Sequence, residues 1–119
     1  MTRFIMVIDD DPALRNVLQS VLESAGYRVQ AAAAPVALAI AGMRHPDLVL
    51  LDLEMPLLDG KEVHSCLQAD RDTAAIPVVA MGDALELARH EALPVQGRVV
   101  KPFQYTALLS EVARCLPLA

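Results

Sequence analysis

Aromatic residues are scarce in this chain of 119 residues, which has two Phe, two Tyr and no Trp. So few rings leave little to stack on the bases of single-stranded nucleic acid. Basic residues are also in the minority, with 10 Lys and Arg against 15 Asp and Glu and a net charge of −5. Because a nucleic-acid-binding domain normally carries a basic patch, we expect no direct nucleic acid binding.

Cysteines and long apolar runs are equally sparse. Cys66 and Cys115 lie far apart and match no spacing typical of metal sites or redox motifs. We interpret them as reduced, partly buried thiols. The N-terminal segment lacks the pattern of a signal peptide, and no apolar run approaches the roughly 18 residues of a membrane span. We therefore expect a cytoplasmic protein without membrane association.

Small aliphatic side chains supply most of what could form a core. The chain contains 19 Ala and 18 Leu, and 55% of its residues are hydrophobic. This composition argues against disorder and against a sheet-only protein, because Ala and Leu favour helices. The length suits one domain, which we expect to span residues 1–119.

Two apolar patterns alternate along the chain. Short continuous apolar runs predict strands buried on both faces, and apolar residues at intervals of three and four predict helices. We expect strands at 4–8, 27–31, 47–51, 76–81 and 95–100, and helices at 12–25, 35–44, 61–69, 84–91 and 104–116. Alternation of this kind with short loops predicts an α/β fold, a doubly wound five-stranded parallel sheet in the order 2-1-3-4-5. The binding site of such a sheet lies at the carboxyl ends of its strands, where the first and third strands are neighbours.

Charged residues stand at these predicted strand ends. Asp9 and Asp10 end the first strand, Asp52 ends the third and Lys101 ends the fifth. Gathered acids repel one another, and a hard cation such as Mg²⁺ relieves the repulsion. Acids, Mg²⁺ and a lysine that holds an anionic oxygen suit phosphoryl transfer. The plainer interpretation is that Asp9, Asp10 and Asp11 cap the first helix and that Asp52 is a solvated loop acid.

Four segments carry a resemblance to a known family. They are Val7-Ile8-Asp9-Asp10-Asp11-Pro12; Leu50-Leu51-Asp52-Leu53-Glu54-Met55-Pro56 with Asp59-Gly60; Ile76-Pro77-Val78-Val79; and Val100-Lys101-Pro102-Phe103. In order and spacing the chain resembles the response-regulator receiver domain of two-component signalling, which has the flavodoxin-like fold. The resemblance extends over essentially the whole chain.

The resemblance implies a phosphoacceptor site. Asp52 would accept a phosphoryl group from a histidine kinase or phosphotransfer protein, with Lys101 contacting a phosphoryl oxygen. Asp10 and Asp52 would bind Mg²⁺ together with the backbone carbonyl of Glu54, and Asp9 would act through a metal-bound water. The bond between Lys101 and Pro102 would be cis. The domain would be no enzyme beyond its own phosphorylation and dephosphorylation, and would act as a monomer or a phosphorylation-dependent dimer on an unidentified output partner.

Two positions depart from the family pattern. Gly82 stands where the family has Thr or Ser, and Arg98 stands where it has Tyr or Phe. Gly82 has no hydroxyl to move toward a phosphoryl group, and an unpaired guanidinium is costly to bury. We expect Arg98 to keep its charge in water and the usual coupled movement to be lost. Any readout would then pass through backbone shifts around Gly82 and Asp83, or through Arg98 approaching an acid such as Asp83 or the phosphorylated pocket.

Three other functions remain as alternatives. One is a degenerate receiver that binds partners constitutively. Another is a Mg²⁺-dependent phosphohydrolase that uses Asp9 and Asp11, although Ala13 stands where that motif needs Thr or Val. A flavin-binding electron carrier is the third, but Asp9, Asp10 and Asp11 would repel the flavin phosphate.

Overall fold

Five parallel strands form one sheet in the order β2-β1-β3-β4-β5. The structure is a computed structural model that describes residues 2–56 and 59–118. Its elements are β1 (Phe4–Ile8), α1 (Pro12–Ser24), β2 (Arg28–Ala32), α2 (Ala34–Arg44), β3 (Leu48–Asp52), α3 (Gly60–Ala69), β4 (Val78–Gly82), α4 (Ala84–Arg89), β5 (Gly97–Val100) and α5 (Tyr105–Cys115). The predicted fold class and strand order are confirmed.

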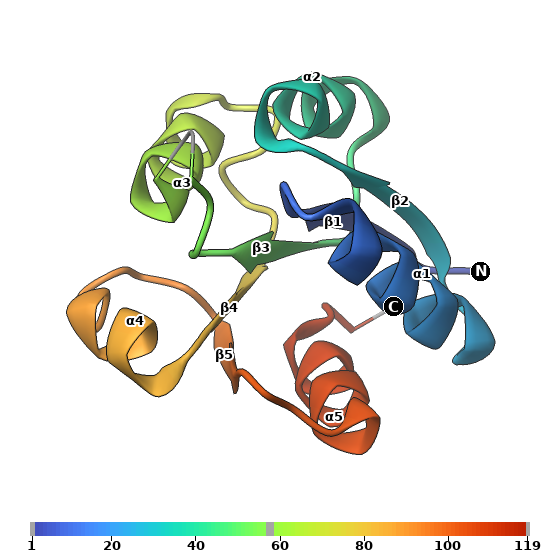
Figure 1. Ribbon diagram of the computed structural model, residues 1–119. Coiled ribbons are helices and arrows are strands. Elements are labelled where there is room, and N and C mark those ends of the chain that lie inside the picture. The colour runs from blue at the N-terminus through green and yellow to red at the C-terminus, as the bar shows by residue number, and fades with distance from the viewer. Residues whose placement is uncertain (1, 57–58, 119) are drawn as a thin grey trace.

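Helices cover both faces of the sheet, as Figure 1 shows, with α1 and α5 on one face and α2, α3 and α4 on the other. Strand β1 explains why both faces must be covered, since all five of its residues are buried. Side chains alternate across a strand, so Ile5 and Val7 join the core under α1 and α5, while Met6 and Ile8 join the core under α2 and α3. A continuous apolar run therefore belongs in the middle of the sheet.

Helix starts follow the expected chemistry in most places. Asp11, Asp59 and Asp83 each accept a backbone N–H from the first turn of α1, α3 and α4. At the start of α4, the Glu86 N–H lies 2.7 Å from Asp83 Oδ1. Gly26, with φ of 97°, lies just beyond the end of α1 and adopts a backbone conformation that favours glycine.

Several boundaries differ from the sequence prediction by one or two residues. Strand β4 begins at Val78 because Ile76 is still bonded to the preceding turn through the Thr73 carbonyl. Helix α4 ends at Arg89, two residues early, and contains only six residues.

The prediction that both thiols are partly buried is wrong for Cys66, which is exposed on α3, while Cys115 is half-buried.

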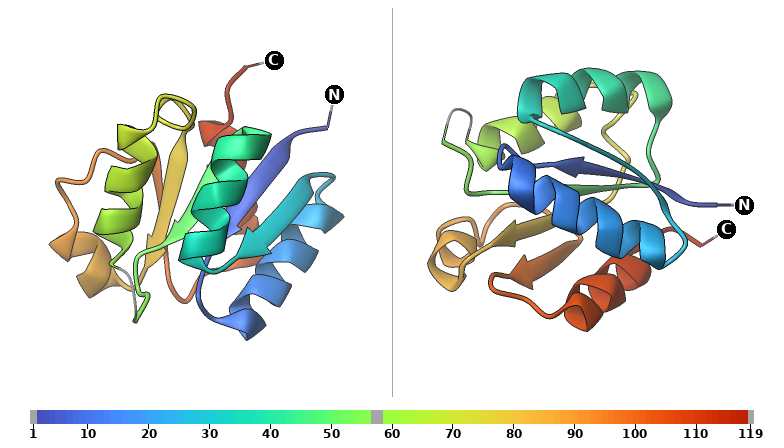
Figure 2. Two further views of the ribbon diagram at one scale, coloured as in Figure 1. Left: turned by 90° about the horizontal axis from the view of Figure 1, so that it is seen from above. Right: turned by 45° about the vertical axis from the view of Figure 1, so that its right-hand side comes forward.

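Both ends of the described chain emerge on the same side of the molecule (Figure 2). None of the helices within residues 2–56 and 59–118 is long and apolar enough to cross a membrane.

Candidate functional site at the carboxyl edge of the sheet

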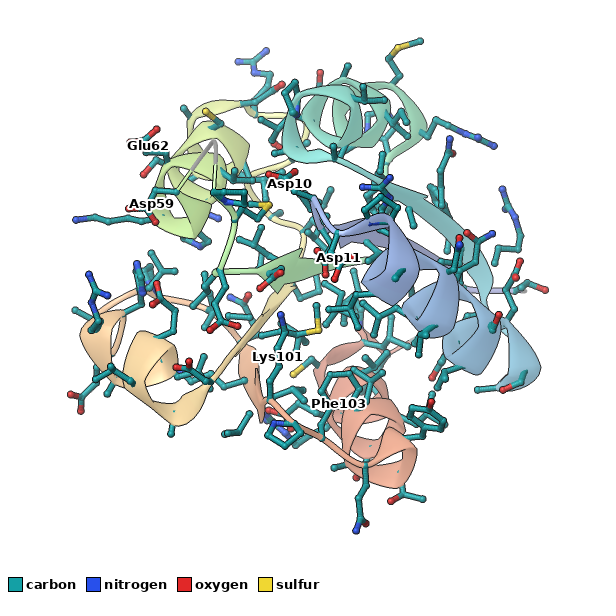
Figure 3. The ribbon with its side chains drawn as sticks, in the orientation of Figure 1. Asp10, Asp11, Asp59, Glu62, Lys101 and Phe103 are labelled. Carbon is teal, nitrogen blue, oxygen red and sulfur yellow. The ribbon has the colours of Figure 1, made fainter. Side chains whose placement is uncertain are left out.

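The site is assembled by the ends of three strands. Asp9 follows β1 directly, Asp52 is the last residue of β3, and Lys101 follows β5. Ile8 pairs in register with Leu51, which places Asp9 next to Asp52. In Figure 3, Asp10 and Lys101 lie on either side of the end of β3. The sheet thus brings together charges that are up to 92 positions apart in the sequence.

Lys101 and Asp52 form the central ion pair, with Lys101 Nζ 2.9 Å from Asp52 Oδ1. The same ammonium lies 3.4 Å from Glu54 Oε2. Burial by itself lowers the pKa of Lys101, but the hydrogen bond to Asp52 and the surrounding carboxylates outweigh burial and raise it. The backbone N–H of Lys101 donates to the Gly82 carbonyl at 2.8 Å, and the bond to Pro102 is cis as expected. Lys101 therefore stays cationic at the site.

Asp52 is almost fully enclosed, with 3% of its surface exposed. Its Oδ1 also accepts the backbone N–H of Glu54 at 2.9 Å. Two donors on one oxygen fix the orientation of the carboxylate and leave Oδ2 as the oxygen without these contacts. A carboxylate held in this way is a positioned oxygen nucleophile.

Asp9 is the most unusual acid of the site, because it is fully buried. Its Oδ1 accepts the Asp11 N–H at 2.9 Å, whereas Oδ2 has no hydrogen-bond partner in the described part of the chain. Burial raises the pKa of Asp9 to about 6, the Asp11 N–H opposes this shift, and the charge of Asp52 adds to it. A cation bound at this buried, unpartnered oxygen would reduce the repulsion between Asp9 and Asp52.

The Asp10 side chain binds the start of α2 in this structure. Its Oδ1 accepts the backbone N–H of Ala34 at 3.2 Å and so caps α2, whose own N-cap residue, Ala33, has no side chain able to do this. Across residues 2–56 and 59–118, no three Asp, Glu, His or Cys side chains are grouped so that they could hold a metal ion. The expected gathering of Asp9, Asp10 and Asp52 is therefore wrong for this conformation, in which only Asp9 and Asp52 are brought together.

Gly82 is buried at the end of β4, as the sequence predicts for a residue beside the site. A Cβ at this position would lie 3.2 Å from the Cβ of Glu86, so α4 approaches the strand end closely. The side chain usual in the family would therefore need a small shift of Glu86.

Arg98 differs from expectation. Its guanidinium does not extend into water, but donates to the main-chain carbonyls of Leu93 at 2.9 Å, Glu91 at 3.1 Å, His90 at 3.2 Å and Leu87 at 3.5 Å. None of its described contacts involves Asp83. Burying a guanidinium is costly only while it is unpaired, and here carbonyls of α4 and of the turn that follows it supply the partners.

Two interactions beside the end of β1 are not evident from the sequence. Asp10 reaches the start of α2, and Arg15 donates to the Asp9 carbonyl at 2.8 Å. A helix that starts at Ala33-Ala34 without a capping side chain is a signal that another element must supply the cap. Nothing local identifies Arg15, because one turn of α1 separates it from the strand end.

Residues 5–113 match the response regulator receiver domain family. That span includes Asp9, Asp52 and Lys101, the three residues that the sheet brings together. The chain belongs to the response regulator receiver domain family. It is a receiver domain of two-component signalling, so the family and functional class predicted from the sequence are confirmed.

Curated relatives agree with this assignment. The chain is 36% identical over 113 residues to the probable transcriptional regulator ycf27 of Cyanophora paradoxa, covering 94% of this chain and 47% of that protein. It is also 36% identical over 116 residues to the DNA-binding dual master transcriptional regulator RpaA of Synechocystis sp., covering 94% and 48%. The chain thus spans about half the length of these relatives.

Solved structures agree on the fold. The chemotaxis response regulator CheY4 of Vibrio cholerae is 26% identical with a TM-score of 0.88, covering 98% of this chain and 100% of that one. The receiver domain of the sensor histidine kinase PA1611 from Pseudomonas aeruginosa is 24% identical with a TM-score of 0.86, covering 97% and 98%. That structure holds a magnesium ion in its active site cleft.

Proposed function

We propose that Asp52 is the phosphoacceptor of this receiver domain. The proposal is carried by the ion pair of Asp52 with Lys101 beside the buried, partnerless oxygen of Asp9. A carboxylate oxygen of Asp52 attacks the phosphorus of a phosphohistidine, the bond between phosphorus and the imidazole nitrogen breaks, and an acyl phosphate forms. The donor is a histidine kinase or a phosphotransfer protein.

The residues present fit a magnesium ion. Asp9 Oδ2 is buried without a partner in the described residues, and oxygen ligands of this kind suit a small hard cation. Asp9 and Asp52 would hold the ion together with the Glu54 carbonyl, and Asp10 would join once it leaves the Ala34 N–H. When bound, Mg²⁺ supplies positive charge that offsets the phosphoryl group and the acids.

Lys101 contributes positive charge beside Asp52. In the unphosphorylated protein its ammonium occupies Asp52 Oδ1 at 2.9 Å. On phosphorylation the same ammonium would shift to a phosphoryl oxygen, a charge-assisted contact that needs little reorganisation. The Glu54 N–H would continue to orient the Asp52 carboxyl.

The chemistry assigned here is limited to the domain's own phosphorylation and dephosphorylation. We do not favour the phosphohydrolase alternative, because its nucleophile, Asp9, is fully buried and Ala13 stands where that motif needs Thr or Val. A constitutive, degenerate receiver stays the second candidate, because Gly82 and Arg98 remove the usual switch side chains. We assign no output partner. RpaA is described as DNA-binding, but this chain matches only about half of that protein, so its DNA binding is not transferred to this chain.

Phosphorylation at a single carboxylate tests the assignment. Intact mass measured after incubation with acetyl phosphate and Mg²⁺ should show one added phosphate that base removes. Asp52→Asn should abolish the addition. Asp59→Asn is the matched control, because Asp59 is an exposed carboxylate that caps α3 and lies beside His90, away from Asp52, and Asn can also cap a helix. Addition that survives Asp52→Asn would assign the acceptor to another residue, and no addition to the wild type would favour the degenerate receiver.

A further inference from the structure

A cavity of about 590 Å³ lies between α3 and the segment that runs from the end of α4 toward β5. These two elements are neighbours on the same face of the sheet (Figure 1). The cavity exists because α4 ends after six residues, at Arg89, and so leaves part of α3 uncovered. Its polar lining consists of Lys61, His64, Ser65, Gln68, Arg89 and His90, and its apolar lining of Ala69, Ala92, Leu93 and Pro94.

The charge of the lining is one-sided. Lys61 and Arg89 are cations, and no carboxylate among the described residues lines the cavity, although the whole chain carries a net charge of −5. Glu54, Asp59 and Glu86 line an adjoining depression, which shares Lys61, Arg89 and His90 with the cavity. Arg89 Nη1 lies 3.6 Å from Glu86 Oε2, and His90 Nε2 lies 3.5 Å from Asp59 Oδ1, so these acids moderate the positive charge without entering the cavity.

His64 is the most buried polar residue of the lining. Only 3% of its surface is exposed, and its Nε2, which has no hydrogen-bond partner among the residues that the structure describes, is buried too. Burial lowers the pKa of His64, which keeps the ring neutral. His64 therefore forms part of the cavity wall and adds no charge to it.

One wall of the cavity is held in place by Arg98. This guanidinium donates to the carbonyls of His90, Glu91 and Leu93, so the turn that follows α4 is fixed to β5. Leu93 also packs against the core beneath α3. The cavity is therefore formed before any ligand arrives, which lowers the cost of binding.

We propose that this cavity binds a small amphipathic anion, an apolar body that carries one carboxylate, sulfonate or phosphate group. The apolar body would lie against Leu93, Ala92 and Pro94, and the anionic group would face Lys61 and Arg89. A volume of about 590 Å³ lies within the range of small-molecule sites, roughly 300–1,000 Å³. The proposal does not depend on the phosphorylation of Asp52, because none of the lining residues belongs to that site.

Two dyes that differ in charge test the proposal on the intact protein. Anilinonaphthalene sulfonate is an aromatic anion, and N-phenyl-naphthylamine is its neutral analogue. We expect saturable fluorescence binding of one sulfonate dye per chain, with the neutral dye several times weaker. Lys61→Gln combined with Arg89→Gln should weaken the sulfonate dye about tenfold and leave the neutral dye unchanged. Arg71→Gln, a change at an exposed cation outside the lining, should affect neither dye.

Amide shifts on titration locate the dye, and they should be confined to residues 60–69 and 89–95. Equal affinity for both dyes, or sulfonate affinity that is unchanged in the Lys61 and Arg89 double variant, would overturn the proposal. Shifts centred on another surface would also overturn it. Sedimentation that shows a dimer dissolved by the dye would instead identify the cavity as an interface between two copies of the chain.

Discussion

Asp9 shows how a functional residue can weaken the fold that carries it. The side chain is fully buried, and its pKa is raised from an ordinary 3.8 to about 6, chiefly by burial. A raised carboxyl pKa stabilises the fold below the unfolded value and loses that stability as the pH rises through about 6. At pH 7 the ionised Asp9 therefore lowers the stability of the fold, and a bound cation would reduce this loss.

Replacing Asp9 by Asn tests this at neutral pH. The amide keeps an oxygen for the Asp11 N–H and can donate to Asp52, so without metal Asp9→Asn should raise the free energy of unfolding by about 2 kcal/mol. Urea unfolding at pH 7 and at pH 4 measures the change, and the gain should shrink at pH 4. The same variant should lose stabilisation by Mg²⁺. Equal stability of both proteins at pH 7, or a gain that grows in acid, would contradict the burial argument.

At both ends of α4, unpaired backbone groups of the helix bind side chains that lie outside it. Asp83 caps the start of the helix, and Arg98 reaches from β5 to the carbonyls at its end. A helix of six residues is too short to be stable by itself, so these contacts decide whether it forms. Arg98 stands where the family resemblance predicts an aromatic ring, and its hydrogen bonds connect β5 to α4 and the turn after it. We call these hydrogen bonds the Arg98 clamp.

Removing the clamp should loosen α4 locally. Arg98→Ala leaves the carbonyls of Leu93 and its neighbours without their donor, which we expect to cost about 1–3 kcal/mol and to speed amide exchange across residues 84–95. Arg89→Ala is the control from the same helix. Its exposed side chain makes only a 3.6 Å pair with Glu86, worth about 0–1 kcal/mol. Identical amide exchange rates in the two variants would show that the Arg98 contacts do not stabilise α4 or the turn after it.

At the scale of the whole molecule, Gly82 and Arg98 are the residues from which we predict how far a phosphorylation signal would travel. Gly82 has no side chain to follow a phosphoryl group, and Arg98 is already committed to four carbonyls. A movement of β5 toward the site would have to break those contacts first. We therefore expect the response to phosphorylation to stay near Asp52.

Amide shifts with and without beryllium fluoride and Mg²⁺ measure this spread. In the wild type we expect changes confined to the strand ends. In Gly82→Thr combined with Arg98→Tyr they should extend over β5 and α5. The added Cβ lies 3.2 Å from Glu86, so Gly82→Ala shows what the crowding alone does. Large changes over β5 and α5 in the wild type, matching the double variant, would mean that the switch is intact.

Particular residues show where prediction from sequence succeeded and where it stopped. The apolar run Phe4–Ile8 predicted a central strand because only a strand covered on both faces can bury five successive apolar side chains. Asp52 and Lys101 were placed together because parallel strands end at the same edge. Asp10 was misplaced, since a carboxylate at a strand end can turn toward a metal or toward a free backbone N–H, and the N–H of Ala34 lies in a different element.

The sequence by itself determined the strands, the strand order and the identity of the acids and the lysine at the site. These follow from local hydrophobic periodicity, short loops and the handedness of crossovers, which act over a few residues at a time. Only the tertiary structure decided that Arg98 binds the end of α4, that Asp10 caps α2, and that a cavity remains beside α3. Such contacts depend on where free backbone groups of one element lie against the side chains of another, and a packed fold must satisfy those groups with whatever donor is within reach.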